Sequence, residues 1–188
     1  RQGVSVANGP GYSTESVAQH GFALLLGLAN SIAGRAASLR DGYWQTGVPD
    51  SYGIHPHFEL AGRTFGVVGY GAIGRAAARI AKGFGMRVLA VDPRATPEQA
   101  EAVGACLSDE ATALREADVI SNHMNLTGEN ERFFDYARFC RMEKHPIFLN
   151  VSRGGSMVET DLVRALAEGL VRAAGLDVLA AENTDLSR

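Results

Sequence analysis

The fold of this chain follows from one stretch of its sequence, Val67-Val68-Gly69-Tyr70-Gly71-Ala72-Ile73-Gly74. The stretch has the glycine spacing GxGxxG and lies between two runs of different character. The apolar run before it predicts a strand over residues 64–69, and the alanine-rich run after it predicts a helix over residues 72–84. A glycine turn that leaves a strand and opens a helix is typical of a site for the diphosphate of a dinucleotide.

The three glycines and the peptide groups after them fit such a ligand. Gly69 permits the tight turn, Gly71 lets a diphosphate approach the backbone, and Gly74 lets the helix lie close on the strand. The N–H groups of Ala72 and Ile73 then lie at the positive end of the helix, where they can bind phosphate oxygens. We therefore predict that these five residues bind a nucleotide cofactor. A glycine turn without a ligand is the structural alternative.

Asp92 indicates which nucleotide this is. It ends the next predicted strand, residues 87–92, eighteen residues after Gly74. A carboxylate at this place can accept hydrogen bonds from the hydroxyls of the adenosine ribose, and its charge would repel the 2′-phosphate of NADP. NAD is therefore the expected cofactor. Arg94 leaves NADP open as an alternative, because a guanidinium two residues later could pair with that phosphate.

The rest of the chain continues the alternation of strands and helices. Strands are predicted over residues 118–122, 147–151 and 172–176, and helices over residues 97–103, 111–116, 132–141 and 159–168. Upstream, apolar residues at helical spacing predict one long helix from Ser13 to Leu39, with Ser13 or Thr14 as its N-cap. Apolar strands that alternate with helices predict an α/β fold, a doubly wound parallel sheet of the Rossmann type with helices on both faces.

Composition narrows the class of protein. The net charge of −3 comes from 18 basic and 21 acidic residues spread along 188 positions, which argues against a nucleic-acid partner. The most apolar run, residues 21–29, is far below the roughly 20 residues that span a bilayer, so neither a membrane span nor a signal peptide is expected. Cys106 and Cys140 have no CxxC spacing and are expected to be buried free thiols in a reducing, cytoplasmic compartment. No residues are assigned to a metal.

A second set of motifs follows the later predicted strands, at the edge where an α/β sheet binds its ligand. The two most specific are Asn150-Val151-Ser152-Arg153-Gly154-Gly155 and Gly175-Leu176-Asp177-Val178, and Glu182 lies five residues beyond Asp177. Three further motifs accompany them: Val17-Ala18-Gln19-His20, Asp41-Gly42-Tyr43-Trp44 and Asn122-His123-Met124-Asn125-Leu126-Thr127. With these motifs and its glycine loop, practically the whole chain resembles the D-isomer-specific 2-hydroxyacid dehydrogenase family. The resemblance implies hydride transfer between NAD and a small D-2-hydroxy acid or 2-keto acid.

The resemblance also implies roles for individual residues. Arg153 would hold the carboxylate and carbonyl oxygens of the substrate, which suits a rigid guanidinium fork. Glu182 would pair with a histidine and raise its pKa, so that the imidazolium can protonate the forming alkoxide. Asp177 would bind the nicotinamide carboxamide, with the capping of local N–H groups as its structural alternative. The implied cofactor contacts are Gly69, Gly71, Ala72, Ile73, Gly74, Asp92, His123, Asn125, Thr127, Val151, Ser152, Arg153 and Asp177.

Parts of the family's active site are expected outside these 188 residues. In the family, the acid/base histidine lies in a Pro-His-x-Gly-like segment one strand beyond the glutamate, and a substrate domain precedes the cofactor domain. We therefore expect residues 1–12 to end a truncated substrate domain, residues 13–60 to form a linking helix and dimerisation arm, and residues 61–188 to form a dinucleotide-binding domain truncated before its last strand. The fragment would lack the catalytic histidine. Of its five histidines, only His123 is expected near the cofactor, where it would shape the loop.

Several alternatives remain open. Asn125 and Asn183 stand where the family usually has proline, and Asn130 stands where it often has threonine. A regulatory NAD-sensing module, as in co-repressor members of the family, is the main rival to a dehydrogenase. A doubly wound enzyme that uses S-adenosylmethionine or NADP is disfavoured by the spacing of Arg153 and Glu182. The resemblance implies a homodimer formed through the first helix and the Tyr43-Trp44 segment, with intramolecular packing as the alternative.

Overall fold

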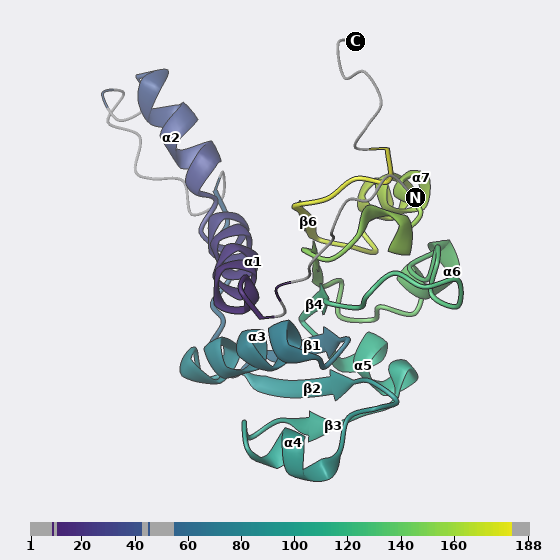
Figure 1. Ribbon diagram of the computed structural model, residues 1–188. Coiled ribbons are helices and arrows are strands. Elements are labelled where there is room, and N and C mark those ends of the chain that lie inside the picture. Colours follow the sequence, from purple (N-terminus) through teal and green to yellow (C-terminus); the bar gives the residue numbers. More distant parts are fainter. Residues whose placement is uncertain (1–8, 10, 43–44, 46–54, 182–188) are drawn as a thin grey trace, which may run out of the picture.

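One parallel sheet organises the chain (Figure 1). The computed structural model describes residues 9, 11–42, 45 and 55–181. Within them the sheet has six strands: β1 (Thr64–Val68), β2 (Arg87–Val91), β3 (Cys106–Leu107), β4 (Val119–Asn122), β5 (Ile147–Asn150) and β6 (Ala173–Leu176). Their order in the sheet is β3-β2-β1-β4-β5-β6, so the chain reverses its direction of travel between β1 and β4. In sheets of this kind the ligand crevice lies at that reversal, beyond the carboxyl ends of the strands.

Helices cover both faces of the sheet, which confirms the predicted Rossmann-type fold. They are α1 (Thr14–Ala29), α2 (Ile32–Arg40), α3 (Ala72–Gly83), α4 (Pro97–Glu101), α5 (Glu110–Glu116), α6 (Tyr136–Phe139) and α7 (Glu159–Ala167). The core on one face joins α1, α3 and α4 to inward residues such as Phe65 and Val67. The core on the other face joins α5, α6 and α7 to Val68, Ile120 and Phe148. Adjacent residues of β1 thus serve opposite cores, as the alternation of side chains along a strand requires.

The predicted single helix over residues 13–39 is wrong, because the helix breaks at Asn30 and Ser31. Ser31 has a left-handed backbone with φ of 50°, which ends α1 and starts α2 in a new direction. Its hydroxyl donates to the carbonyl of Pro56 at 2.8 Å, a contact that helps to offset the cost of this conformation. The helices bend by 53°. As a result α2 projects away from the sheet and buries none of its residues (Figure 1).

Three smaller expectations also need correction. The helix predicted over residues 132–141 shrinks to α6, because Phe134 instead forms a parallel bridge with Met157. Strand β3 was not predicted, since two residues are too few to show a period. Cys106 and Cys140 are free thiols, as expected, but both are exposed and not buried.

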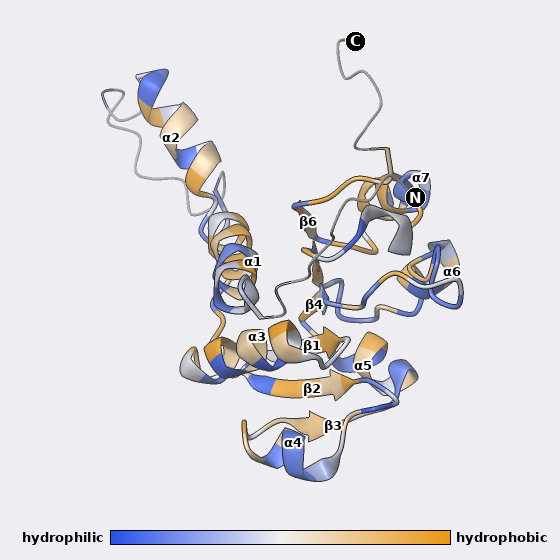
Figure 2. Cartoon of the chain, viewed as in Figure 1, coloured by the Kyte–Doolittle hydropathy of each residue, from blue (hydrophilic) through white to orange (hydrophobic). Residues whose placement is uncertain are grey.

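Apolar residues are prominent along α1 and in the strands of the sheet (Figure 2). Residues Ala18, Phe22, Leu25 and Ala29 of α1 are buried against the sheet. Of the helices that the structure describes, none is on its own long and apolar enough to cross a membrane; α1 and α2 meet that test only as a bent pair, by length and composition.

The turn from β1 to α3 has no room for a side chain at two of its glycines, Gly69 and Gly74. A Cβ atom on Gly74 would lie 2.2 Å from the carbonyl oxygen of Gly69 and 3.1 Å from Cγ1 of Val67. Gly69 itself has φ of 93°, and a Cβ there would lie 2.6 Å from the amide nitrogen of Met124. Both positions therefore require glycine, which fixes α3 directly on the end of β1.

We expect Gly74→Ala to lower the free energy of unfolding by about 2 kcal/mol or more, because the added methyl group collides with backbone. Gly83→Ala is the matched control, since Gly83 ends the same helix and a Cβ there would meet nothing within 4 Å. It should leave the free energy of unfolding unchanged or raise it by up to about 1 kcal/mol. Urea denaturation followed by circular dichroism measures both variants, and equal stabilities would contradict the packing argument.

Candidate functional site

The amino terminus of α3 offers unpaired peptide groups to a ligand. Gly71 is the N-cap and has no side chain to bond the first turn, so the amides of Ala72 and Ile73 have no partner inside the helix. A Cβ on Gly71 would meet nothing within 4 Å, so the space before these amides is open. A helix of 12 residues gives this end partial positive charge. The arrangement fits the diphosphate of a dinucleotide.

Asp92 lies beside this turn because β2 is the neighbour of β1. Its Oδ2 accepts a hydrogen bond from the Tyr70 amide at 2.8 Å, and its Oδ1 accepts one from the Arg94 amide at 2.9 Å. The two bonds orient the carboxylate against the glycine turn. Each carboxylate oxygen keeps a further lone pair, so both remain able to accept from ribose hydroxyls.

The register of the sheet places the other predicted residues at the same edge as the glycine turn. Val68 pairs with Asn122, Asn122 with Asn150, and Asn150 with Leu176. These four residues form one row across the carboxyl ends of β1, β4, β5 and β6. The residues that follow them, and that emerge at the same edge of the sheet, are Gly69, His123, Val151 and Asp177.

His123 is held as a neutral ring. Its Nε2 is in hydrogen-bond contact with the hydroxyl of Ser121 at 2.8 Å, and its Nδ1 is buried without a partner among the described residues. Burial lowers the pKa of His123 to about 4. The ring is therefore uncharged near pH 7 and cannot serve as the imidazolium acid, which agrees with the shaping role expected for it.

The loop after His123 is fixed by Asn130. The side-chain amide of Asn130 donates to the carbonyl of Asn125 at 2.6 Å, and its oxygen accepts from the amide of Thr127 at 2.7 Å. The side chains of Asn125 and Thr127 are exposed at the edge of the site. Asn130 thus sets the shape of this loop.

Sequence reasoning missed a buried polar network beneath the site. Asn122 Nδ2 donates to Asn150 Oδ1 at 3.1 Å and to Ser156 Oγ at 2.7 Å, and all three side chains are fully buried. Asn150 Nδ2 donates to the carbonyl of Arg153 at 3.1 Å, and Asn150 Oδ1 accepts from the amide of Ser152 at 3.2 Å. The network therefore ties the ends of β4 and β5 to the loop that carries Arg153. An asparagine at the end of each of two apolar strands was the available signal.

Arg153 has a fixed backbone and an exposed side chain. Its carbonyl accepts hydrogen bonds from Asn150 and, at 2.6 Å, from the hydroxyl of Ser156. Its Nη1 donates to the carbonyl of Ser152 at 2.8 Å, and among the described residues the other guanidinium N–H groups have no partner, so they can bind oxygens of a ligand. The hydroxyl of Ser152 donates to the carbonyl of Met124, so the loops after β4 and β5 are joined. Glu182 lies outside the described residues.

Asp177 meets a residue that sequence analysis did not assign to the site. Its amide donates to the carbonyl of Asn150 at 3.0 Å, which extends the pairing of β6 with β5. Its Oδ1 lies 3.2 Å from Nε2 of His20, on α1. The Val17-Ala18-Gln19-His20 motif had indicated only a helix start.

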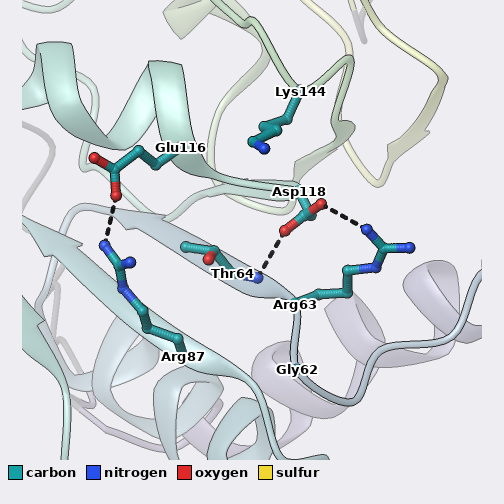
Figure 3. Close-up of a pocket in the computed structure, with 7 residues that line it drawn as sticks. All are labelled: Gly62, Arg63, Thr64, Arg87, Glu116, Asp118 and Lys144. Atoms are coloured by element: carbon teal, nitrogen blue, oxygen red, sulfur yellow. Dashed lines mark hydrogen bonds and ion pairs between the residues drawn. The ribbon is translucent and has the colours of Figure 1, made fainter.

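A separate cavity lies at the opposite edge of the sheet (Figure 3). Its volume is about 440 Å³ and its lining residues are Gly62, Arg63, Thr64, Arg87, Glu116, Asp118 and Lys144. Arg63 pairs with Asp118 at 3.3 Å and Arg87 with Glu116 at 2.6 Å. The first pair joins the residues before β1 and β4, and the second joins the start of β2 to the end of α5, so both lie away from the glycine turn. Among the described residues, no group of three or more His, Cys, Asp and Glu side chains is placed to hold a metal ion.

Comparison with known proteins agrees with this geometry. Residues 22–187 match the family profile described as D-isomer specific 2-hydroxyacid dehydrogenase, NAD binding domain. The chain is 38% identical over 186 residues to the glyoxylate reductase of Thermococcus litoralis, covering 97% of the chain and 55% of that protein.

Two solved structures extend the comparison. The apo-structure of D-lactate dehydrogenase from Escherichia coli superimposes with a TM-score of 0.86 at 34% identity, covering 98% of this chain and 57% of that one. D-lactate dehydrogenase with NAD⁺ from Lactobacillus jensenii gives a TM-score of 0.82 at 30% identity, covering 98% and 56%. The chain thus spans about half the length of the relatives that it matches. Its fold, its site and these matches together show that the chain belongs to the D-isomer-specific 2-hydroxyacid dehydrogenase family of oxidoreductases and comprises its NAD-binding domain, with NAD as the cofactor.

Proposed function

We propose that this chain is the cofactor domain of a dehydrogenase that transfers hydride between NAD and a small D-2-hydroxy acid or its 2-keto acid. The observation that carries the proposal is the set of unpaired amides at Ala72 and Ile73 beside the oriented carboxylate of Asp92. The names of its relatives support the substrate class, since glyoxylate and the oxidation product of lactate are both 2-keto acids.

In this proposal the cofactor lies along the carboxyl edge of the sheet. Its diphosphate binds the amides at the start of α3, and its adenosine ribose binds Asp92. Its nicotinamide end extends toward β5 and β6, where Asp177 accepts from the carboxamide. The contacts between these ends come from His123, Asn125, Thr127, Val151, Ser152 and Arg153. Bound NAD supplies the hydride acceptor, while the residues of the chain bind and orient it.

Arg153 is the substrate residue in this proposal. A 2-keto acid presents a carboxylate oxygen and a carbonyl oxygen side by side, which the free donors of one guanidinium can bind together. Because the backbone of Arg153 is held by Asn150 and Ser156, the guanidinium is tethered to the same network that ends β4 and β5. Holding both oxygens would orient the carbonyl carbon toward the nicotinamide. Glu182 is the proposed partner of the acid/base histidine.

We expect the 188-residue chain to bind NAD⁺ and Gly71→Val to weaken that binding at least tenfold, or about 1.4 kcal/mol. The valine side chain would enter the open space before the amides of Ala72 and Ile73 and exclude the diphosphate, while the fold keeps room for it. Isothermal titration calorimetry measures the affinity, with Gly83→Ala as a control that should bind like the wild type. A folded wild-type chain that binds neither NAD⁺ nor NADH would refute the proposed function.

Turnover by these 188 residues should be negligible. Arg153 is present, but the neutral ring of His123 is no acid, and these 188 residues contain no Pro-His-x-Gly segment of the kind that would carry the acid/base histidine. With glyoxylate and NADH, the decrease in absorbance of NADH should not exceed that of a sample without protein. A rate near that of a version extended to include a Pro-His-x-Gly-like segment would show that another residue supplies the proton.

We also propose a cytoplasmic location and a homodimer formed through the first two helices. The exposed free thiols of Cys106 and Cys140 suit a reducing compartment. Helix α2 projects away from the sheet (Figure 1). The exposed fractions of its apolar residues Ile32 and Leu39 are 56% and 55%. A second copy that covers this arm would bury these side chains; Tyr43 and Trp44, which the resemblance assigns to the same contact, lie outside the described residues.

Gel filtration at micromolar concentration should show a particle near 40 kDa, twice the 20.0 kDa of the chain. The double variant Ile32→Glu with Leu39→Glu should elute as a monomer, because two carboxylates would be buried without partners in the contact. Val163→Glu on α7 is the matched control, since Val163 is 66% exposed and lies on the other face of the sheet. A monomeric wild type would contradict the proposed dimer.

A further inference from the structure

We propose that His20 is a positioning residue for Asp177: its Nε2 lies 3.2 Å from Oδ1 and holds that oxygen, so that Oδ2 is left to accept a hydrogen bond from the nicotinamide carboxamide. The inference rests on the proposed function, in which Asp177 binds the nicotinamide end of NAD. It adds a residue from α1, a helix that ends at Ala29, well before the glycine turn begins at Gly69.

The backbone on both sides of this pair is fixed by packing. A Cβ on Gly175 of β6 would lie 3.1 Å from Cβ of Leu24 on α1, and 2.9 Å from Cδ2 of Leu149 on β5. A Cβ on Gly21 would lie 3.6 Å from Cγ1 of Val151. Helix α1 is therefore in close contact with β6 and with the residue after β5. Since His20 directly precedes Gly21, its distance from Asp177 is set by these contacts.

The amide and one carboxylate oxygen of Asp177 have partners, whereas the other carboxylate oxygen can still accept a hydrogen bond. Its amide bonds to Asn150 and its Oδ1 meets His20, whereas Oδ2 forms no hydrogen bond or ion pair with any residue that the structure describes. A carboxylate has two acceptor oxygens, so one can be used for orientation and the other for a ligand. Without His20 the side chain would rotate freely, and binding of the carboxamide would have to restrict that rotation.

The exposure of the pair argues for a role in binding and against one in stability. The side chains of His20 and Asp177 are 49% and 45% exposed. Polar contacts this accessible contribute little to the free energy of folding, because water competes for both partners. The pair does, however, lie at the edge of the sheet where Val151 and Asp177 emerge, beside the loop of Arg153. Its orienting effect is therefore available to a ligand bound there.

The test separates the nicotinamide end of the ligand from the rest. Calorimetry is carried out on the 188-residue chain with NAD⁺ and with ADP-ribose, which lacks the nicotinamide. His20→Leu removes the ring nitrogen that lies against Oδ1 of Asp177, and His20→Gln puts a side-chain amide at a similar reach. We expect His20→Leu to weaken NAD⁺ about fivefold and to leave ADP-ribose within about twofold. His20→Gln should bring NAD⁺ back to within about twofold of the wild type.

Each other outcome has a distinct meaning. If His20→Leu binds NAD⁺ like the wild type, or loses NAD⁺ and ADP-ribose equally, His20 does not position the nicotinamide contact and the inference fails. Equal affinity of the wild type for both ligands would show that the nicotinamide adds nothing, and the inference would fail while the dinucleotide site stood. A folded wild type that binds neither ligand would instead remove the proposed function itself.

Discussion

The contact between the first turn of α3 and the end of β1 sets the geometry of the whole site. At Gly74 the helix touches the carbonyl of Gly69 so closely that no side chain fits between them. This approach places the amino terminus of α3, and with it the unpaired amides of Ala72 and Ile73, at the carboxyl edge of the sheet. A helix displaced outward by one methyl group would still pack, but these amides would shift relative to the carboxylate of Asp92, which the Tyr70 amide of the same turn binds.

From that fixed point the site extends along one row of the sheet. Backbone pairing places Val68, Asn122 and Asn150 side by side. The side chains of the two asparagines form a hydrogen bond with each other on the face of the sheet that α5, α6 and α7 cover. Since the loops after these strands start from the same row, their separations are set by strand spacing. The position of Arg153, the proposed substrate residue, is thus set by the sheet through the hydrogen bonds of Asn150 and Ser156 to its carbonyl.

Most of the fold could be predicted from the sequence because it depends on local patterns. Apolar strands, alternating helices and the glycine spacing each act over a few residues, and the boundaries came within a few residues of those observed. The errors lie where a distant contact decides. The left-handed Ser31 is bonded to Pro56, 25 residues away, and the shortened α6 results from the bridge between Phe134 and Met157. Neither contact can be read from the spacing of apolar and polar residues near these positions.

The same division holds within the site. Residues that follow strands, such as Asp92 and Asp177, could be placed at this edge from the sequence, because the ligand edge of a parallel sheet is known in advance. The link between Asn122, Asn150 and Ser156 could not, since it depends on the register of β4 and β5 and on the turn at residues 154–156. The pairing of His20 with Asp177 depends on how closely α1 packs on β6, which a helical period does not reveal.

The composition of the buried network has a consequence for how the site responds to its surroundings. Asn122, Asn150 and Ser156 bind through amide and hydroxyl groups, which neither gain nor lose a proton over the range in which proteins stay folded. Dissolved ions screen charges but hardly affect bonds between buried neutral groups. The spacing of the strand ends should therefore persist in acid and in concentrated salt, after the exposed ion pairs of the chain have weakened.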